Sequence, residues 1–104
     1  MTNRLIELEK MLQEDPTDSF LIYAIALEKE KAGNAAEAAE LIQQLHDQNP
    51  EDLSYYHKLA DIYFNLDEQE KAVSIIELGV EKAEQQQNQK VKNELEQLRF
   101  LKED

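Results

Sequence analysis

The fold of this chain can be predicted from the stretch YYHKLADIYFNLDEQEKAVSIIELG, residues 55–79. Apolar residues recur in it every three or four positions, which is the spacing of one face of an α-helix. A short polar break at residues 65–68 interrupts this pattern. We therefore predict two amphipathic helices on either side of a short turn.

The same pattern occurs 34 residues earlier in the chain. A shift by that distance places the anchor residues of the first copy on those of the second. The pairs are Pro16 and Pro50, Ile22 and Tyr56, Ile25 and Leu59, Ala26 and Ala60, Ala38 and Ala72, and Ile42 and Ile76. An internal repeat of this length is typical of arrays of helix-turn-helix units.

Four of these anchors are alanines that recur at fixed positions of each copy. Ala26 and Ala60 follow a large apolar residue on the first helix, and Ala38 and Ala72 lie near the start of the second. Small side chains at facing points let two helix backbones approach closely, while bulkier neighbours fill the grooves. Their fixed spacing favours this packing role over a simple contribution to helix propensity.

Both copies contain a recognisable motif. The second copy reads Tyr56-x2-Leu59-Ala60-x2-Tyr63 and then Ala72-x3-Ile76, and the first reads Ile22-x2-Ile25-Ala26-x2-Lys29 and then Ala38-x3-Ile42 with Pro50. Through these motifs residues 17–84 resemble the tetratricopeptide repeat (TPR) family. The first copy departs from the family pattern at Lys29, where an aromatic residue is expected, and neither copy contains a Trp. The resemblance implies an all-α fold, an antiparallel right-handed helical array (α-solenoid).

We expect a single TPR-like domain with two full helix pairs and two capping helices. Its predicted parts are an N-terminal capping helix in residues 1–14, repeat 1 in 17–50, repeat 2 in 51–84 and a C-terminal capping helix in 88–104. Each cap has an apolar stripe at helical spacing with which it can cover the neighbouring repeat. These stripes are Leu5, Leu8, Met11 and Leu12 in the first cap, and Val91, Leu95, Leu98 and Leu101 in the second.

The ends of the helices also carry sequence signals. Thr17 or Asp18 can cap the helix that follows, and Gly33 suits a left-handed helix end. Asp67 occupies the position of Gly33 in the second copy, so we expect that turn to use different chemistry. Glu84 replaces the proline that closes the first copy, which predicts a longer last helix in the second.

Charge narrows the range of partners. The 104 residues include 11 Lys and Arg against 23 Asp and Glu, a net charge of −12, and the excess lies in residues 1–86 with 19 acids and 7 bases. Nucleic-acid binding requires clustered basic residues, so we expect no nucleic-acid partner for this acidic chain. The acidity favours a basic or apolar protein or peptide partner. The alternative is that the charges only form a solvated surface.

We expect neither a signal peptide nor a membrane-spanning segment in this sequence. The first ten residues contain no continuous apolar run, and nowhere do about 18 apolar residues occur together, as a spanning helix would require. We therefore expect a soluble, cytoplasmic protein that does not contact membranes.

No catalytic or metal-binding pattern is recognisable in the sequence. Cys is absent, and neither His46 nor His57 has a second His at metal-ligand spacing. We expect both histidines to lie at the surface. There is no Gly-rich phosphate loop and no nucleophile motif. We expect a protein that is not an enzyme and binds no metal and no cofactor.

Surface recognition is the remaining class of function. In the TPR family the side of the first helices opposite the anchors lines a concave groove that receives peptides. At about 100° per residue, helical spacing assigns the residues of that side. They are Phe20, Tyr23, Leu27 and Lys31 in the first copy, and His57, Asp61 and Asn65 with Phe64 at the edge in the second. The inferred groove is apolar over the first repeat and polar over the second.

Two interpretations of this groove stay open. In the first, the protein is an interaction module or scaffold, and the groove binds a peptide segment of a partner. In the second, it is a structural, homo-oligomerising subunit, and the apolar stripe closes a homodimer. The N-terminal helix could also cover the stripe, because arrays this short need additional burial to be stable.

Overall fold

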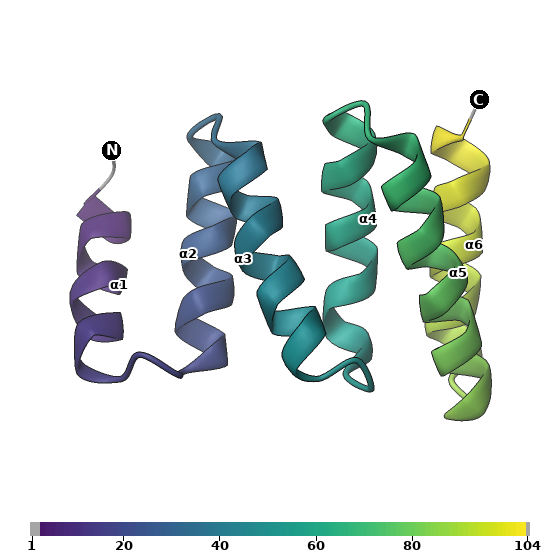
Figure 1. Ribbon diagram of the computed structural model, residues 1–104, viewed down its shortest axis with the longest axis horizontal. Coiled ribbons are helices and arrows are strands. Elements are labelled where there is room, and N and C mark those ends of the chain that lie inside the picture. The colour runs from purple at the N-terminus through teal and green to yellow at the C-terminus, as the bar shows by residue number, and fades with distance from the viewer. Residues whose placement is uncertain (1–2, 104) are drawn as a thin grey trace. The chain divides into compact units, whose positions relative to one another are not determined.

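A computed structural model describes residues 3–103, and over this range the chain is helical with no strand. The predicted all-α fold is therefore confirmed. The elements are α1 (Asn3–Glu14), α2 (Ser19–Lys31), α3 (Ala35–Gln48), the 3-10 helix η1 (Leu53–Tyr55), α4 (Tyr56–Asn65), α5 (Gln69–Gln85) and α6 (Gln89–Lys102) (Figure 1).

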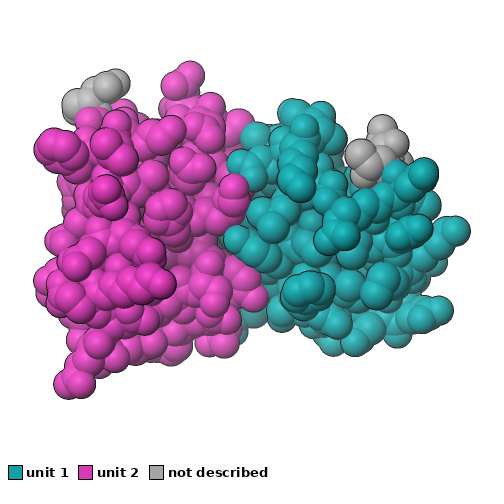
Figure 2. Space-filling model, turned by 180° about the vertical axis from the view of Figure 1, so that it is seen from behind, with its two compact units in different colours: residues 1–48 teal, residues 49–104 magenta. Residues whose placement is uncertain are grey.

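The chain consists of two compact units, residues 1–48 and residues 49–104 (Figure 2). The first contains α1, α2 and α3, and the second contains η1, α4, α5 and α6. Consecutive helices within each unit run antiparallel and pack against each other (Figure 1). Each unit thus holds one predicted helix pair and one predicted capping helix. The single domain and the repeat limits 17–50 and 51–84 stay predictions.

One part of the core of the first unit forms where α1 packs on α2. Leu5 and Leu8 of α1 are buried in one cluster with Leu21 and Ile25 of α2. Leu12, Ala24 and Leu41 are partly buried against the same cluster. An ion pair supports this contact, since Arg4 Nε lies 2.9 Å from Glu28 Oε1. The apolar stripe predicted for residues 1–14 therefore covers α2.

The core of the second unit lies between α4, α5 and α6. Its largest side chains without exposed surface include Tyr56, Leu59, Ile76 and Leu95. Gly79 of α5 has no room for a side chain, because a Cβ atom there would be 2.7 Å from Leu95 Cδ1 and 2.9 Å from Tyr56 Cδ1.

The alanine anchors behave as the sequence predicts. Ala26, Ala38, Ala60 and Ala72 have no exposed surface. Each lies on a helix that packs against its partner within the same pair, α2 on α3 or α4 on α5. Small residues at these points therefore sit inside the helix contacts, as the packing interpretation requires.

Two residues of the predicted cap stripes are not buried. Met11 is 53% exposed and Leu101 is 69% exposed, so both assignments were wrong. By helical spacing each lies about 90° from the centre of its buried stripe. A neighbouring helix covers the centre of such a stripe and leaves its edge in water.

Side-chain caps define several helix starts. Asp18, rather than Thr17, caps α2, and its Oδ1 accepts hydrogen bonds from the backbone N–H groups of Phe20 at 2.9 Å and Leu21 at 3.2 Å. Asn88 caps α6 by accepting from the Val91 N–H at 3.1 Å. Asp52 accepts from the Ser54 N–H at 2.9 Å and so opens η1, whereas α4 begins only at Tyr56.

Three helices end in the same left-handed turn, which corrects the expectation for Asp67. The residues with positive φ are Gly33 at 89°, Asp67 at 59° and Gln87 at 57°. After each of them, the next N–H bonds to the carbonyl five residues back: Asn34 to Lys29, Glu68 to Tyr63 and Asn88 to Ala83. These bonds define Schellman motifs. Asp67 therefore uses the same turn as Gly33, because an Asp side chain tolerates the left-handed region better than most side chains.

The prediction of a longer last helix in the second copy is confirmed. Helix α5 has 17 residues, whereas α3 has 14. The missing proline allows α5 to continue to Gln85, where the Schellman turn at Gln87 ends it.

Candidate interaction surfaces

Helix α2 carries the predicted groove residues of the first unit. The Asp18 cap starts this helix, so that Phe20, Tyr23, Leu27 and Lys31 follow on one side of it. Phe20 is 75% exposed, Tyr23 and Leu27 are half-buried, and Lys31 is exposed. Helix α1 packs elsewhere on α2, against the side that carries Leu21 and Ile25. The N-terminal helix therefore does not cover Phe20.

Helix α4 carries the predicted groove residues of the second unit. His57 and Asn65 are exposed, whereas Asp61 and Phe64 are half-buried. Helix α6 packs beside α4, and Lys102 Nζ of α6 lies 3.9 Å from Asp61 Oδ1. The side of α4 predicted to line the groove is therefore partly flanked by α6.

A shallow hollow of about 420 Å³ lies between α4 and α6. It is lined by His57 of α4 and by Glu94, Gln97, Leu98 and Leu101 of α6. The sequence pattern does not indicate that these α6 residues belong to a candidate site. Residues 88–104 lack the small anchors of the repeats, so the pattern predicts only a cap with one apolar stripe.

Solved structures of known proteins resemble this fold closely. A crystal structure of a tetratricopeptide repeat domain protein from Salinibacter ruber is 31% identical, with a TM-score of 0.72 over 83% of this chain and 96% of that chain. This chain belongs to the tetratricopeptide repeat family. A solution NMR structure of a TPR domain protein from Salinibacter ruber is 32% identical, with a TM-score of 0.76 over 85% of this chain and 89% of that chain. No family model and no curated protein matches the sequence.

The TPR assignment confirms the resemblance inferred from the two sequence copies, and the chain is a helical repeat module. The structure also shows how the repeats differ at Lys29. In repeat 1 Lys29 Nζ lies 3.0 Å from Glu37 Oε2. In repeat 2 the equivalent positions are Tyr63 and Lys71, and Lys71 Nζ lies 5.6 Å from the centroid of the tyrosine ring. An ion pair and a cation-π contact thus connect the two helices of a TPR repeat at the same place.

The two histidines of this TPR protein lie in different environments. His57 is exposed as expected, but His46 is 5% exposed, so the prediction that both lie at the surface was wrong. His46 follows the fully buried Ile42 by four residues on α3. That spacing places both side chains on the same buried face of α3, so His46 is buried together with Ile42.

Residues 3–103 form neither a metal site nor a membrane-spanning helix. Across residues 3–103, no three His, Asp or Glu side chains are arranged to hold a metal ion. Over the same range, no helix is both long and apolar enough to cross a membrane.

Proposed function

We propose that this TPR protein is a non-catalytic interaction module whose first helices, α2 and α4, bind a peptide segment of a partner protein. The observation that carries the proposal is the exposure of Phe20, of which 75% is accessible, beside the half-buried Tyr23 and Leu27. Complete burial of such an aromatic side chain contributes about 1.5 to 3 kcal/mol. A partner that covers Phe20 would gain a substantial part of this energy.

The charge of the second unit indicates the chemistry of the partner. Helical spacing places Asp61 on the same side of α4 as His57, and Glu94 of α6 lines the same hollow as His57. The whole chain carries a net charge of −12. Apolar residues of a partner would therefore be held at α2, and basic residues would be attracted to α4. The two surfaces lie on different units, and each can be tested on its own.

Selection from a random-peptide display library tests the proposal directly. Peptides selected on the wild-type protein should be enriched in apolar and basic residues. Phe20→Ala should weaken their binding about tenfold, because truncating a central aromatic residue commonly costs more than 1 kcal/mol. Asp61→Asn should selectively weaken the basic peptides. The proposal is wrong if no selected peptide depends on Phe20 or Asp61.

The alternative function, a homo-oligomeric subunit, predicts a different result for the same variant. If Phe20, Tyr23 and Leu27 closed a homodimer, the wild-type protein would be a dimer and Phe20→Ala would dissociate it. Size-exclusion chromatography with light scattering over a range of concentrations separates the two cases. A monomer at all concentrations supports the interaction module, and a dimer lost in Phe20→Ala assigns the stripe to self-association.

A further inference from the structure

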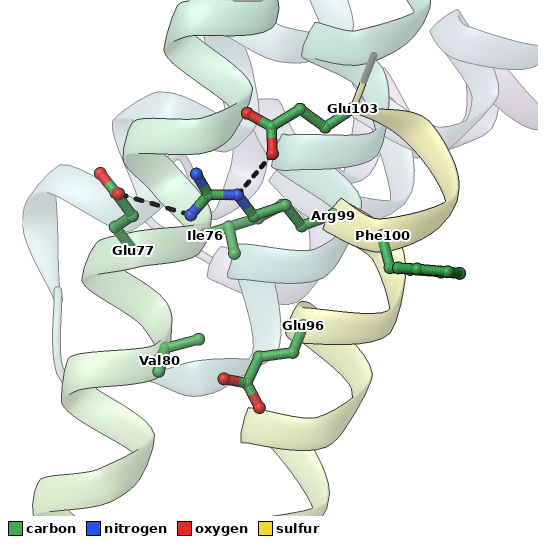
Figure 3. A pocket seen from close by; sticks show the side chains of 7 residues that line it. All are labelled: Ile76, Glu77, Val80, Glu96, Arg99, Phe100 and Glu103. Carbon is green, nitrogen blue, oxygen red and sulfur yellow. Dashed lines mark hydrogen bonds and ion pairs between the residues drawn. The ribbon is translucent and has the colours of Figure 1, made fainter.

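A second hollow, of about 530 Å³, lies between α5 and α6 on the second unit (Figure 3). It is lined by Ile76, Glu77 and Val80 of α5 and by Glu96, Arg99, Phe100 and Glu103 of α6. The α6 residues have the spacing i, i+3, i+4 and i+7, so they form one face over two helical turns. Two adjacent antiparallel helices thus form a trough, the shape into which a third helix packs.

The floor of this trough is apolar. Ile76 and Val80 project from α5 towards α6 in Figure 3. Phe100 lies at the edge and is 85% exposed, the largest exposed fraction among the large apolar side chains that the structure describes. Within residues 3–103, no helix covers it. A large exposed aromatic residue beside an apolar hollow is typical of a contact site.

The rim of the trough is acidic. Within residues 3–103, Glu77, Glu96 and Glu103 surround it together with one cation, Arg99. Arg99 is already paired, since its Nε lies 2.7 Å from Glu103 Oε1 and its Nη1 lies 3.4 Å from Glu77 Oε2. The rim therefore has an excess of negative charge. A second copy of this chain, with its net charge of −12, would be repelled, whereas a basic segment would be attracted.

We infer that the trough between α5 and α6 docks an amphipathic helix of a partner protein, with Lys or Arg residues beside its apolar stripe. Apolar side chains of the docked helix would cover Phe100 and fill the space above Ile76 and Val80. Its basic side chains would reach Glu96 and the outer oxygens of Glu77 and Glu103.

This site is distinct from the proposed peptide surface on α2 and α4. Glu94, Gln97, Leu98 and Leu101 of α6 line the hollow beside α4, whereas Glu96, Arg99, Phe100 and Glu103 line the trough beside α5. Helix α6 thus presents two different faces, and a substitution on one face leaves the other intact.

The test uses synthetic peptides and the full chain. The probe is a fluorescein-labelled amphipathic Leu/Lys peptide of about 14 residues, long enough to form a helix on binding. We expect it to bind wild-type protein in an anisotropy titration and Phe100→Ser to weaken binding about tenfold. Glu96→Lys should also weaken it and should improve the binding of a matching Leu/Glu peptide. In NMR titrations, the amide signals of Val80 and Phe100 should shift most.

Matched controls separate this site from general attraction to an acidic protein. Met11→Ser removes an exposed apolar side chain from α1, which belongs to neither proposed surface, and should leave the binding of the Leu/Lys peptide unchanged. A scrambled Leu/Lys peptide of the same composition, without an apolar face, should bind at least about tenfold more weakly. Circular dichroism should show that Phe100→Ser is folded, because this side chain is exposed.

Three results would overturn the inference. The scrambled peptide could bind as tightly as the amphipathic one, or Phe100→Ser could leave binding unchanged. Light scattering could show a dimer that Phe100→Ser dissociates, in which case a second copy occupies the trough. If Phe20→Ser weakens binding and Phe100→Ser does not, the peptide binds α2. That result overturns the inference and supports the proposed function.

Discussion

The backbone angle of Asp67 lowers the stability of the protein. Its φ of 59° is unfavourable for a residue with a Cβ atom, and the side chain is exposed. We predict that Asp67→Gly stabilises the protein by about 1 kcal/mol, because Gly adopts this angle without the steric cost. Urea denaturation followed by circular dichroism measures the effect.

Gly33 provides the reverse experiment for the same turn. Its φ is 89°, and a Cβ atom at this position would meet nothing within 4 Å. Gly33→Ala should therefore cost about 1 kcal/mol through the backbone alone. If Gly33→Ala is neutral or Asp67→Gly is destabilising, the left-handed turns do not limit stability in the way proposed.

Tyr56 couples stability to alkaline pH. Its hydroxyl donates a hydrogen bond to the Pro50 carbonyl at 2.5 Å, and burial, together with the charge of Glu51, raises the pKa of this tyrosine above its usual 10.0. The folded state thus binds the proton more tightly than the unfolded state does. The resulting stability is fully present below about pH 10 and is lost as the pH rises towards the folded-state pKa.

The matched variant for this effect is Tyr56→Phe. At pH 7 it should lower the free energy of unfolding by about 1 kcal/mol, because the Pro50 carbonyl loses its hydrogen bond. Between pH 9 and pH 11 its stability should fall less than that of the wild-type protein. Urea titrations across this pH range measure both slopes, and parallel slopes would show that Tyr56 does not titrate differently in the two states.

Gly79 shows how packing between elements can reverse a helix propensity. In an isolated helix, Gly→Ala is stabilising by about 1 kcal/mol. In α5, however, the new Cβ atom would lie 2.7 Å from Leu95 Cδ1 and 2.9 Å from Tyr56 Cδ1, and both neighbours are fully buried. We predict that Gly79→Ala costs about 1 to 3 kcal/mol, because overpacking outweighs propensity. A rise in the thermal midpoint would show that α4 and α6 move apart without cost.

The helices could be predicted because their anchors recur, but the faces of α6 could not. Ala26 and Ala60 occupy equivalent positions, so a single packing rule applied to both. Helix α6 lacks the small anchor residues of the repeats, and Glu94 stands where the shift by 34 residues would place an alanine. Its apolar spacing located the buried Leu95 and Leu98. The polar residues between them gave no indication that Glu96 borders one hollow and Glu94 another, since that depends on which helices flank α6.

At the scale of the molecule, the family could be predicted from the period of 34 residues. The candidate binding surface could be predicted only as separate helix faces. The period specifies which side of a first helix packs inside its own pair. It contains no information about what covers the other side. Thus Phe20 could be predicted on the side of α2 opposite the anchors, where it is exposed, but Phe100 and the trough between α5 and α6 could not be predicted.

The net charge leads to a prediction for the whole chain. Ion pairs such as Lys29–Glu37 and Lys92–Glu84 have an exposed carboxylate partner, so water screens them and each contributes little to stability. A net charge of −12 instead acts across the molecule and opposes folding by self-repulsion. The Debye length falls from about 30 Å at 0.01 M salt to about 10 Å at 0.1 M. Added salt should therefore weaken the repulsion between distant charges more than it weakens the attraction within close ion pairs.

We expect the urea midpoint to rise when NaCl is increased from about 10 mM to about 150 mM, a range over which screening becomes strong. The control is the double variant Glu7→Lys and Glu40→Lys, which replaces two exposed acids and lowers the net negative charge. Its midpoint at low salt should exceed that of the wild-type protein, and its dependence on salt should be smaller. A midpoint that falls with salt would mean that the ion pairs, and not the net charge, dominate the electrostatics of this fold.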